Sequence, residues 1–343
     1  MAAADPGAWR AIVLGCAGPT LTADERALFA AVQPLGFILF GRNCERPDQV
    51  SRLVADLRAA VGRDAAPVLI DQEGGRVQRL GPPHWRAAPP AAAFGALADR
   101  NRAREATRLN ARLIAHDLAA LGIDVDCAPV LDVPATGADA VIGDRAFGPD
   151  PAVVADLGRA FAAGLVAGGV APVIKHVPGH GRAEADSHRA LPVVAAPREA
   201  LARSDFAPFR ALADAPWAMT AHVVYAALDD RPATLSPTVI AEVIRGEIGF
   251  SGALLGDDLS MAALTGRLED RAAAALAAGC DAVLHCTGDL AEMRRLAAAV
   301  GRLSPPAAER VARALAARRP AEPFDPASGA RRLAALMADA SRA

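Results

Sequence analysis

The feature that most constrains the fold of this 343-residue chain is a repeated alternation of short apolar runs with longer segments of helical period. Eight apolar runs are expected to be strands: Arg10–Leu14, Gly36–Phe40, Pro67–Ile70, Val125–Val130, Ala171–Ile174, Trp217–Ala221, Ala253–Gly256 and Ala282–His285. Seven helix candidates lie between them: Ala23–Val32, Pro47–Val61, Asn101–Leu121, Pro151–Ala167, Pro197–Ala213, Pro237–Gly246 and Asp270–Ala278. Two more helical segments, Leu290–Val300 and Ala307–Ala317, follow the last strand. This order predicts an α/β protein with a (β/α)8 barrel of the TIM type. A doubly wound open sheet is the alternative, but Gly15–Gly18 lacks the spacing of its phosphate-binding turn.

Length and composition narrow the class of protein further. A length of 343 residues suits a single catalytic barrel domain (1–343) with C-terminal helices, and 52% hydrophobic residues allow a large core. A formal charge of -2 disfavours nucleic acid as a partner. The five cysteines are odd in number and show no CxxC pair, so we expect reduced thiols in a cytoplasmic protein. The sequence predicts neither a secretory leader nor a membrane span.

Polar side chains stand at the carboxyl ends of five predicted strands. These residues are Asp71, Asp132, Lys175 with His176, His222 and Asp257. In a barrel such strand ends converge on one face, where the active site is built. The sequence therefore predicts a polar pocket at that face.

One segment carries a specific resemblance. Lys175-His176-Val177-Pro178-Gly179-His180-Gly181 is followed, after four residues, by Asp186-Ser187-His188. This pattern resembles the signature of glycoside hydrolase family 3, and in particular its single-domain bacterial β-N-acetylhexosaminidases, the NagZ type. The resemblance runs from about Ile12 to Cys286 and implies a barrel fold, glycosidase activity and no cofactor.

The resemblance also implies catalytic roles. The segment Leu254–Met261 resembles the family's nucleophile motif, which implies that Asp257 attacks the anomeric carbon. His188 would be the acid/base, and Asp186, two residues away, would orient its imidazole. Glu184 is a rival acid, and Asp258 is expected to cap the next helix.

Further residues are implied in substrate binding. The acidic-Gly-Gly-Arg segment after the third strand contributes Asp71 and Arg79, with Arg76 expected to brace the loop. The segment Ile142–Gly148 contributes Arg145, with Phe147 packed beneath it. The resemblance assigns Lys175 and His176 to sugar binding as well, and His222 is expected to line the pocket.

Two supporting residues, one histidine and one aspartate, and a candidate metal site remain to be considered. His180, between two glycines, is expected to support the loop, and Asp132 to be a structural hydrogen-bond partner. His176, His180 and His188 suggest a zinc site, but Pro178-Gly179 disfavours the helix that such spacing usually needs. We therefore expect no metal and no cofactor.

These expectations combine into one function. We expect a cytoplasmic, retaining exo-β-N-acetylglucosaminidase that removes terminal β-linked GlcNAc from GlcNAc-anhydroMurNAc-peptides in cell-wall recycling. Three alternatives stay open: a β-N-acetylglucosaminide phosphorylase, a broad β-glucosidase/hexosaminidase, and a sugar-binding barrel that has lost catalysis. The expected partner is a small carbohydrate, with a monomer or weak dimer as the working form. The small residues of the loop Gly179–His188 predict a mobile lid over the site.

Overall fold

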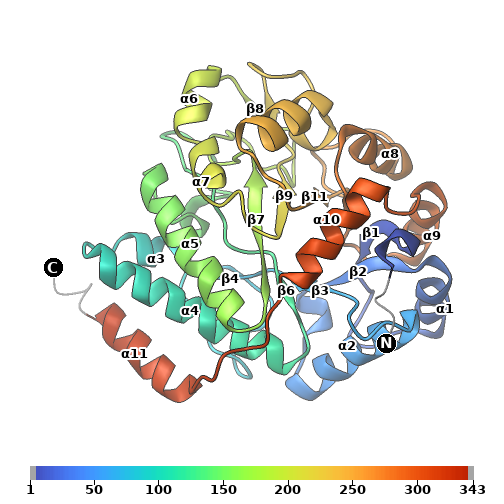
Figure 1. Cartoon of the computed structure of the whole chain (residues 1–343), viewed down its shortest axis with the longest axis horizontal. Coiled ribbons are helices and arrows are strands. Elements are labelled where there is room, and N and C mark those ends of the chain that lie inside the picture. Colours follow the sequence, from blue (N-terminus) through green and yellow to red (C-terminus); the bar gives the residue numbers. More distant parts are fainter. Residues whose placement is uncertain (1–4, 339–343) are drawn as a thin grey trace.

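The computed structural model describes residues 5–338 and contains a closed barrel of eight parallel strands (Figure 1). These strands are β1 (Arg10–Leu14), β2 (Pro34–Leu39), β3 (Val68–Ile70), β6 (Val125–Asp126), β7 (Ala171–Val177), β9 (Trp217–Thr220), β11 (Ala253–Asp258) and β12 (Ala282–His285). Each pairs with its neighbour in this order, and β12 closes the barrel against β1 through the pairs Ile12–Val283, Val13–Leu284 and Leu14–His285. The predicted (β/α)8 barrel is confirmed.

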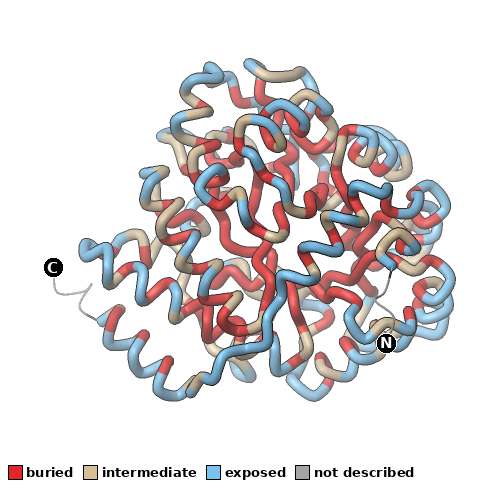
Figure 2. The backbone as a smooth tube through the Cα atoms, in the orientation of Figure 1, coloured by how far each residue is buried: buried red, intermediate tan, exposed pale blue. Residues whose placement is uncertain are grey.

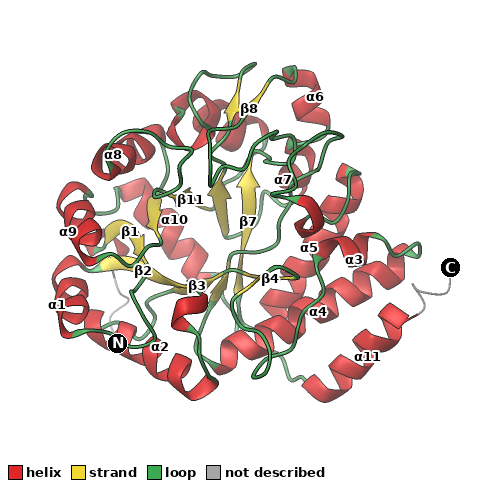
Figure 3. Ribbon diagram, turned by 180° about the vertical axis from the view of Figure 1, so that it is seen from behind, coloured by secondary structure: helices red, strands yellow, loops and turns green. Residues whose placement is uncertain are grey.

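Helices surround this barrel, as Figures 1 and 3 show from opposite sides. They are α1 (Ala23–Val32), α2 (Pro47–Val61), α3 (Ala91–Gly95), α4 (Arg100–Ala120), α5 (Pro151–Ala167), α6 (Arg198–Arg203), α7 (Phe206–Ala211), α8 (Leu268–Ala278), α9 (Leu290–Ala299), α10 (Pro305–Ala316) and α11 (Pro326–Ala338). A π-type helix, Val239–Glu247, connects β9 to β11. Single-turn 3-10 helices occupy Pro6–Ala8, Gly41–Asn43, Gly143–Arg145 and Ala233–Leu235.

Local chemistry explains where these elements begin and how closely they pack. The N-terminus of α1 is a capping box, in which Thr22 and Glu25 each accept the other's backbone N–H. Glu25 also accepts the N–H of Ala17 at 2.8 Å, which ties the loop after β1 to the helix. Helices α4 and α5 approach so closely that a Cβ at Gly164 would lie 2.3 Å from the carbonyl oxygen of Arg108. The buried residues fill the barrel and its contact with the helices (Figure 2).

Two predicted elements are shorter or divided in the structure. The run Val125–Val130 is a strand only at Val125–Asp126, because the Ala128 N–H turns back to the Asp126 carbonyl at 2.8 Å and Pro129 has no N–H to donate. Val130 pairs again, as an isolated bridge to Lys175. The predicted helix Pro197–Ala213 is two helices, interrupted where the Asp205 carboxylate turns inward to Arg182 at 2.7 Å.

Short strand pairs join the loops at the carboxyl end of the barrel. The hairpin of β4 (Gln72–Gly74) and β5 (Val77–Gln78) follows β3, and β8 (Val193–Val194) pairs in parallel with β10 (Val224–Tyr225). The loops after β3, β7 and β9 therefore carry their own backbone pairing. No helix within residues 5–338 is long and apolar enough to cross a membrane, and the cysteines are all free thiols.

Candidate active site

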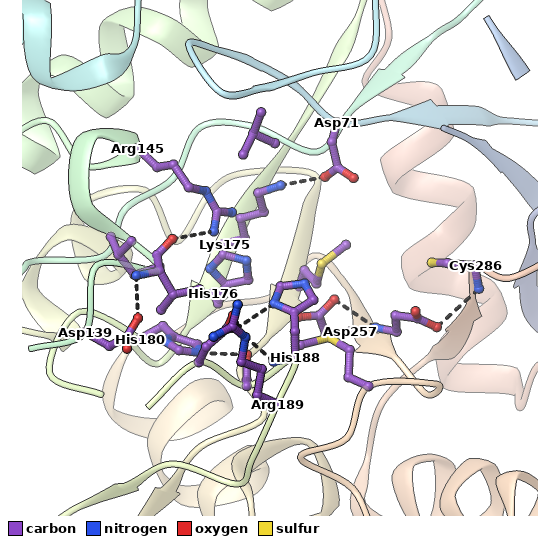
Figure 4. A pocket seen from close by; sticks show the side chains of 18 of the residues that line it. Asp71, Asp139, Arg145, Lys175, His176, His180, His188, Arg189, Asp257 and Cys286 are labelled. Carbon is purple, nitrogen blue, oxygen red and sulfur yellow. Dashed lines mark hydrogen bonds and ion pairs between the residues drawn. The ribbon is translucent and has the colours of Figure 1, made fainter. Parts of the chain in front are cut away.

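The carboxyl ends of the barrel strands surround a cavity of about 710 Å³ (Figure 4). Eight of the nine site residues predicted from the sequence line it: Asp71, Arg79, Arg145, Lys175, His176, Asp186, His188 and Asp257. They come from the loops or ends of different strands, so only the closed barrel brings them together. The ninth, His222, does not line the cavity.

An alternating row of charges runs along one wall of the cavity and is here called the charge row: Arg79, Asp71, Lys175, Glu73 and Arg145. All of them except the buried Glu73 line the cavity. The Lys175 ammonium lies 2.7 Å from a carboxylate oxygen of Asp71 and 2.7 Å from one of Glu73. Arg79 donates to Asp71 at 3.0 Å, and Arg145 binds Glu73 through two bonds of 2.8 Å. Each charge is therefore held by at least one opposite charge.

The charge row keeps its members ionised. Burial alone raises the pKa of Asp71, but Lys175 and Arg79 outweigh it and hold that pKa well below its usual range. The pKa of Glu73 is lowered in the same way, with Lys175 and Arg145 opposing the effect of burial. Burial disfavours the Lys175 cation, yet Asp71 and Glu73 raise its pKa overall. The row therefore presents fixed charges to whatever enters the cavity.

Glu73 is a site residue that the sequence reasoning missed. It is buried, and it is the counterion shared by Lys175 and Arg145. The available signal is its spacing from Asp71, since alternate residues of an extended segment point the same way.

Asp132 holds the strand–loop junction on the far side of Lys175. Its carboxylate accepts a bond from His176 Nδ1 at 2.7 Å and from the backbone N–H of His180 at 2.7 Å. Burial raises the pKa of Asp132, but the His176 ring outweighs it and lowers the pKa to about 2. Because an ionised carboxylate only accepts, His176 donates through Nδ1 and its Nε2 is directed elsewhere. This geometry fits a structural role for Asp132.

His180 anchors the loop that was expected to be loosely held. Its Nε2 lies 3.0 Å from the Ser187 hydroxyl, and burial lowers its pKa to about 4, so the ring is neutral. Tyr225 donates to the carbonyl of Gly179 at 2.6 Å, and the carbonyl of Ala183 accepts the N–H of Asp139 at 2.8 Å. The prediction that few side chains anchor this loop therefore applies to part of it, because His180, as expected, and backbone hydrogen bonds hold the rest. Over residues 179–191, Arg182 and the segments 184–186 and 188–191 are partly or fully exposed.

Asp186 and His188 form the expected pair. His188 Nδ1 lies 2.8 Å from Asp186 Oδ1, and the same oxygen accepts the His188 backbone N–H at 2.9 Å. Burial raises the pKa of Asp186, but the His188 bonds outweigh it and the pKa is lowered. The ionised carboxylate fixes the proton on Nδ1 and leaves Nε2 for proton exchange. The His188 side chain is 63% exposed, so solvent reaches it freely.

Asp257 and Asp258 end strand β11 beside this pair, and both line the cavity. Burial raises the pKa of Asp257, but the rings of His222 and His176, the Asp258 N–H and Lys175 lower it overall. Asp257 is thus an ionised carboxylate, as a nucleophile requires.

Asp258 departs from its expected role. It accepts the backbone N–H of Ser260 at 3.1 Å and that of Cys286 at 3.2 Å. Helix α8 begins only at Leu268, so Asp258 caps a turn and joins it to β12 instead of capping a helix.

His222 lies beneath the cavity instead of in its wall. It is fully buried, with Nδ1 2.7 Å from the Thr234 hydroxyl and Nε2 3.0 Å from the carbonyl oxygen of Asp258. Both ring nitrogens are engaged by the protein. This geometry gives His222 a supporting position under the Asp257–Asp258 peptide.

The remaining predicted residues occupy supporting or outer positions. Arg76 binds Asp144 at 2.8 Å and thereby braces the loop, and Phe147 is buried edge-on against Phe161. Glu184 is an exposed residue of the cavity wall. Within residues 5–338, no three His, Cys, Asp or Glu side chains are grouped as metal ligands.

Comparison with known proteins gives a consistent set of similarities. The family model described as "Glycosyl hydrolase family 3 N terminal domain" matches residues 14–316. The chain is 44% identical over 281 residues to a β-hexosaminidase of Alkalilimnicola ehrlichii, covering 80% of each chain. It is 43% identical over 295 residues to a β-hexosaminidase of Pseudomonas aeruginosa, covering 85% of this chain and 86% of the relative.

Solved structures agree with the sequence relatives. NagZ from Neisseria gonorrhoeae in complex with N-trifluoroacetyl-D-glucosamine has a TM-score of 0.83 at 31% identity, with 97% of each chain covered. A family 3 β-N-acetylglucosaminidase from Paenibacillus sp. str. FPU-7 has a TM-score of 0.83 at 32% identity, covering 98% of this chain and 68% of that one.

Proposed function

This chain belongs to glycosyl hydrolase family 3, as a β-hexosaminidase of the NagZ type, and on that premise we propose that it removes terminal β-linked GlcNAc with retention. The observation that carries the mechanism is the presence of Asp257 and the Asp186–His188 pair in the wall of one cavity. A retaining glycosidase needs a nucleophile and a separate proton donor at one glycosidic bond. Asp257 supplies the first and His188 the second.

The first step forms a glycosyl-enzyme. A carboxylate oxygen of Asp257 bonds to the anomeric carbon while the bond from that carbon to the leaving oxygen breaks. The proton on His188 Nε2 moves to the leaving oxygen, and the electron pair of the broken bond stays with that oxygen. Asp186 stabilises the protonated imidazole before this transfer, because its carboxylate is ionised and bound to Nδ1.

The second step releases the sugar. His188, now neutral, takes a proton from water through Nε2, and the water oxygen attacks the anomeric carbon. The bond to Asp257 breaks and its carboxylate is regenerated. Two inversions at one carbon give net retention.

The charge row binds and orients the sugar. The Asp71 carboxylate lies in the cavity wall and accepts from sugar hydroxyls, while Arg79, Arg145 and Lys175 donate. His176, fixed by Asp132, contributes Nε2 to the same subsite. These groups are held before the sugar arrives, so little ordering remains to be done on binding.

The cavity and the family support a proposal for the substrate class. A cavity of about 710 Å³ holds more than one sugar ring, which leaves room for a leaving-group sugar such as an anhydroMurNAc-peptide. We propose cell-wall recycling in the cytoplasm as the setting, with the protein acting as a monomer or weak dimer.

Three measurements test this proposal. Aryl β-GlcNAc, β-GalNAc and β-glucoside are compared as substrates, and GlcNAc turnover is expected to dominate; dominant glucoside turnover would remove the recycling assignment. Asp257→Ala is expected to lose several orders of magnitude in rate, and a fluorinated glycoside that traps the intermediate should label Asp257. Labelling of Asp258 instead would show that Asp257 is not the nucleophile.

A phosphorylase is the second candidate, because the acid/base is a histidine. A neutral imidazole repels an incoming phosphate anion less than a carboxylate base does. Added phosphate should leave free GlcNAc as the product, whereas formation of GlcNAc 1-phosphate would favour the phosphorylase.

A further inference from the structure

Five cationic side chains line the cavity, and four of them are tightly engaged. Each of the four has a carboxylate oxygen within 3.0 Å: Arg76 with Asp144, Arg79 with Asp71, Arg145 with Glu73, and Lys175 with Asp71 and Glu73. These cations have little capacity for a second anion. They suit a neutral sugar, whose hydroxyls accept single hydrogen bonds.

Arg189 is different from these four. Its nearest carboxylate contact is Asp186 Oδ2 at 3.8 Å, and its side chain is 87% exposed. The other oxygen of Asp186 already accepts two bonds from His188. Among the cations of the cavity wall within residues 5–338, Arg189 therefore has the loosest partner. Its guanidinium keeps the planar fork of donors that binds a carboxylate through two bonds.

The position of Arg189 fixes which part of a substrate it meets. It follows His188 directly in the chain, and Figure 4 shows the two side chains on the same side of the cavity. In the mechanism proposed above, His188 protonates the leaving oxygen. The group that departs with that oxygen must therefore lie beside Arg189, whereas the bound GlcNAc lies against the charge row.

We propose that Arg189 is a specificity-determining residue that binds a carboxylate of the leaving group. This inference rests on the proposed function, because it places the leaving group by the role of His188. This narrows the preferred substrates to GlcNAc glycosides whose leaving group keeps a free carboxylate close to the glycosidic oxygen, such as GlcNAc-anhydroMurNAc without its peptide, because the peptide is attached through the lactyl carboxyl group. Glu184, an exposed carboxylate of the same loop, opposes this preference and keeps it moderate.

The test uses two substrates that differ in one charge. GlcNAc-β-anhydroMurNAc with its free lactyl carboxylate is compared with the N-methylamide of the same disaccharide, so the leaving alcohol is unchanged. The measured quantity is the ratio of kcat/KM for the acid to that for the amide. Arg189→Gln should lower this ratio by up to about fivefold, the upper end of what an exposed ion pair contributes.

Matched variants make the result specific. Arg189→Lys should keep part of the preference, because it keeps the charge and loses the fork. Arg331→Gln removes an exposed arginine on α11, outside the cavity wall, and should leave the ratio unchanged. Glu184→Gln should raise the ratio, and higher salt should lower the wild-type ratio toward that of Arg189→Gln.

Equal ratios in the wild type and Arg189→Gln would overturn the assignment of Arg189. That result differs from failure of the proposed function, which would show as no hydrolysis of a neutral aryl β-GlcNAc by the wild type.

Discussion

At the scale of single residues, the site is built from charged side chains that oppositely charged neighbours hold in place. Lys175 is only 2% exposed, and taking such a charge out of water costs several kcal/mol unless partners compensate. Asp71 and Glu73 compensate it, and Arg79 and Arg145 in turn compensate them. Removing Glu73 would leave the largely buried Arg145 guanidinium without its counterion, and removing Asp71 would leave Arg79 without one. The row is thus better explained by the geometry it gives the cavity than by stability.

The Asp186–His188 pair leads to a prediction on leaving groups. Asp186→Asn removes the charge that stabilises the protonated imidazole, so proton donation to poor leaving groups should suffer most. Aryl leaving groups of low basicity need less protonation and should lose less in glycosylation. Single-turnover rates across a series of aryl β-GlcNAc substrates measure this dependence.

The same substitution should change the pH profile in a defined direction. The lowered pKa of Asp186 keeps it ionised wherever histidine titrates, and this charge favours the protonated acid. In Asp186→Asn the alkaline limb of kcat/KM should therefore move to lower pH. Equal losses for all leaving groups with an unmoved limb would contradict the pairing.

The role of a residue could be predicted from the sequence where the residue stands in a motif. It could not be predicted where the role depends on contacts formed in the folded protein. Asp257 and His188 stand in segments whose residue order matches a family, so their positions in one cavity could be expected. The roles of Glu73 and His222 could not be predicted, because these roles depend on partners far along the chain. Glu73 meets Arg145, and His222 meets the carbonyl of Asp258, only after the barrel closes.

At the scale of elements, long periodic segments were predicted well and short ones were missed. Helices α1, α2 and α5 have the predicted bounds, because Thr22 and prolines at the helix starts mark their N-termini. Helix α3 and the pairs β4–β5 and β8–β10 span two to five residues each and carry no period to detect. Their stability comes from packing and loop contacts, which a single sequence does not reveal.

The loop after β7 should show two levels of motion. Backbone amides around 179–183 are buried beside Asp132 and Tyr225, whereas 184–186 and 188–191 are partly or fully exposed. Hydrogen exchange should therefore be slow in the first segment and fast in the other two, with protection of the outer segments on binding a GlcNAc-like inhibitor.

Ser187→Ala provides the control for this loop. It removes the hydroxyl that lies 3.0 Å from His180 Nε2 and should speed exchange in the outer segments without exposing residues 179–183. Uniformly slow exchange across the loop, with and without the inhibitor, would refute the partial lid.

At the scale of the whole molecule, buried His180 links stability to pH. Burial lowers its pKa from 6.5 to about 4, so the fold favours the neutral ring. The contribution of His180 to the free energy of unfolding is complete above pH 6.5. It is lost as pH falls toward 4, because in this range the histidine binds a proton in the unfolded chain but not in the folded one. The loss amounts to about 3 kcal/mol at most.

A difference measurement isolates this effect. Asp205, whose pKa burial raises to about 6, acts in the opposite direction over part of this range. Urea unfolding of the wild type and His180→Gln should therefore be compared at pH 7.5, 6 and 4.5. The stability gap between them should shrink as pH falls. A constant gap would show that His180 does not carry the linkage.

The charge row has a consequence for inhibitor design. Its three positive and two negative groups leave one positive charge in excess, and ionised Asp257 supplies one negative charge nearby. A cationic sugar mimic is attracted by Asp257 and repelled by the excess of the row, so the two effects offset each other and a positive charge on the mimic gains little. An uncharged mimic with the flattened ring of the transition state avoids that repulsion and still makes every hydroxyl contact. For this enzyme, ring shape is therefore a better starting point than charge.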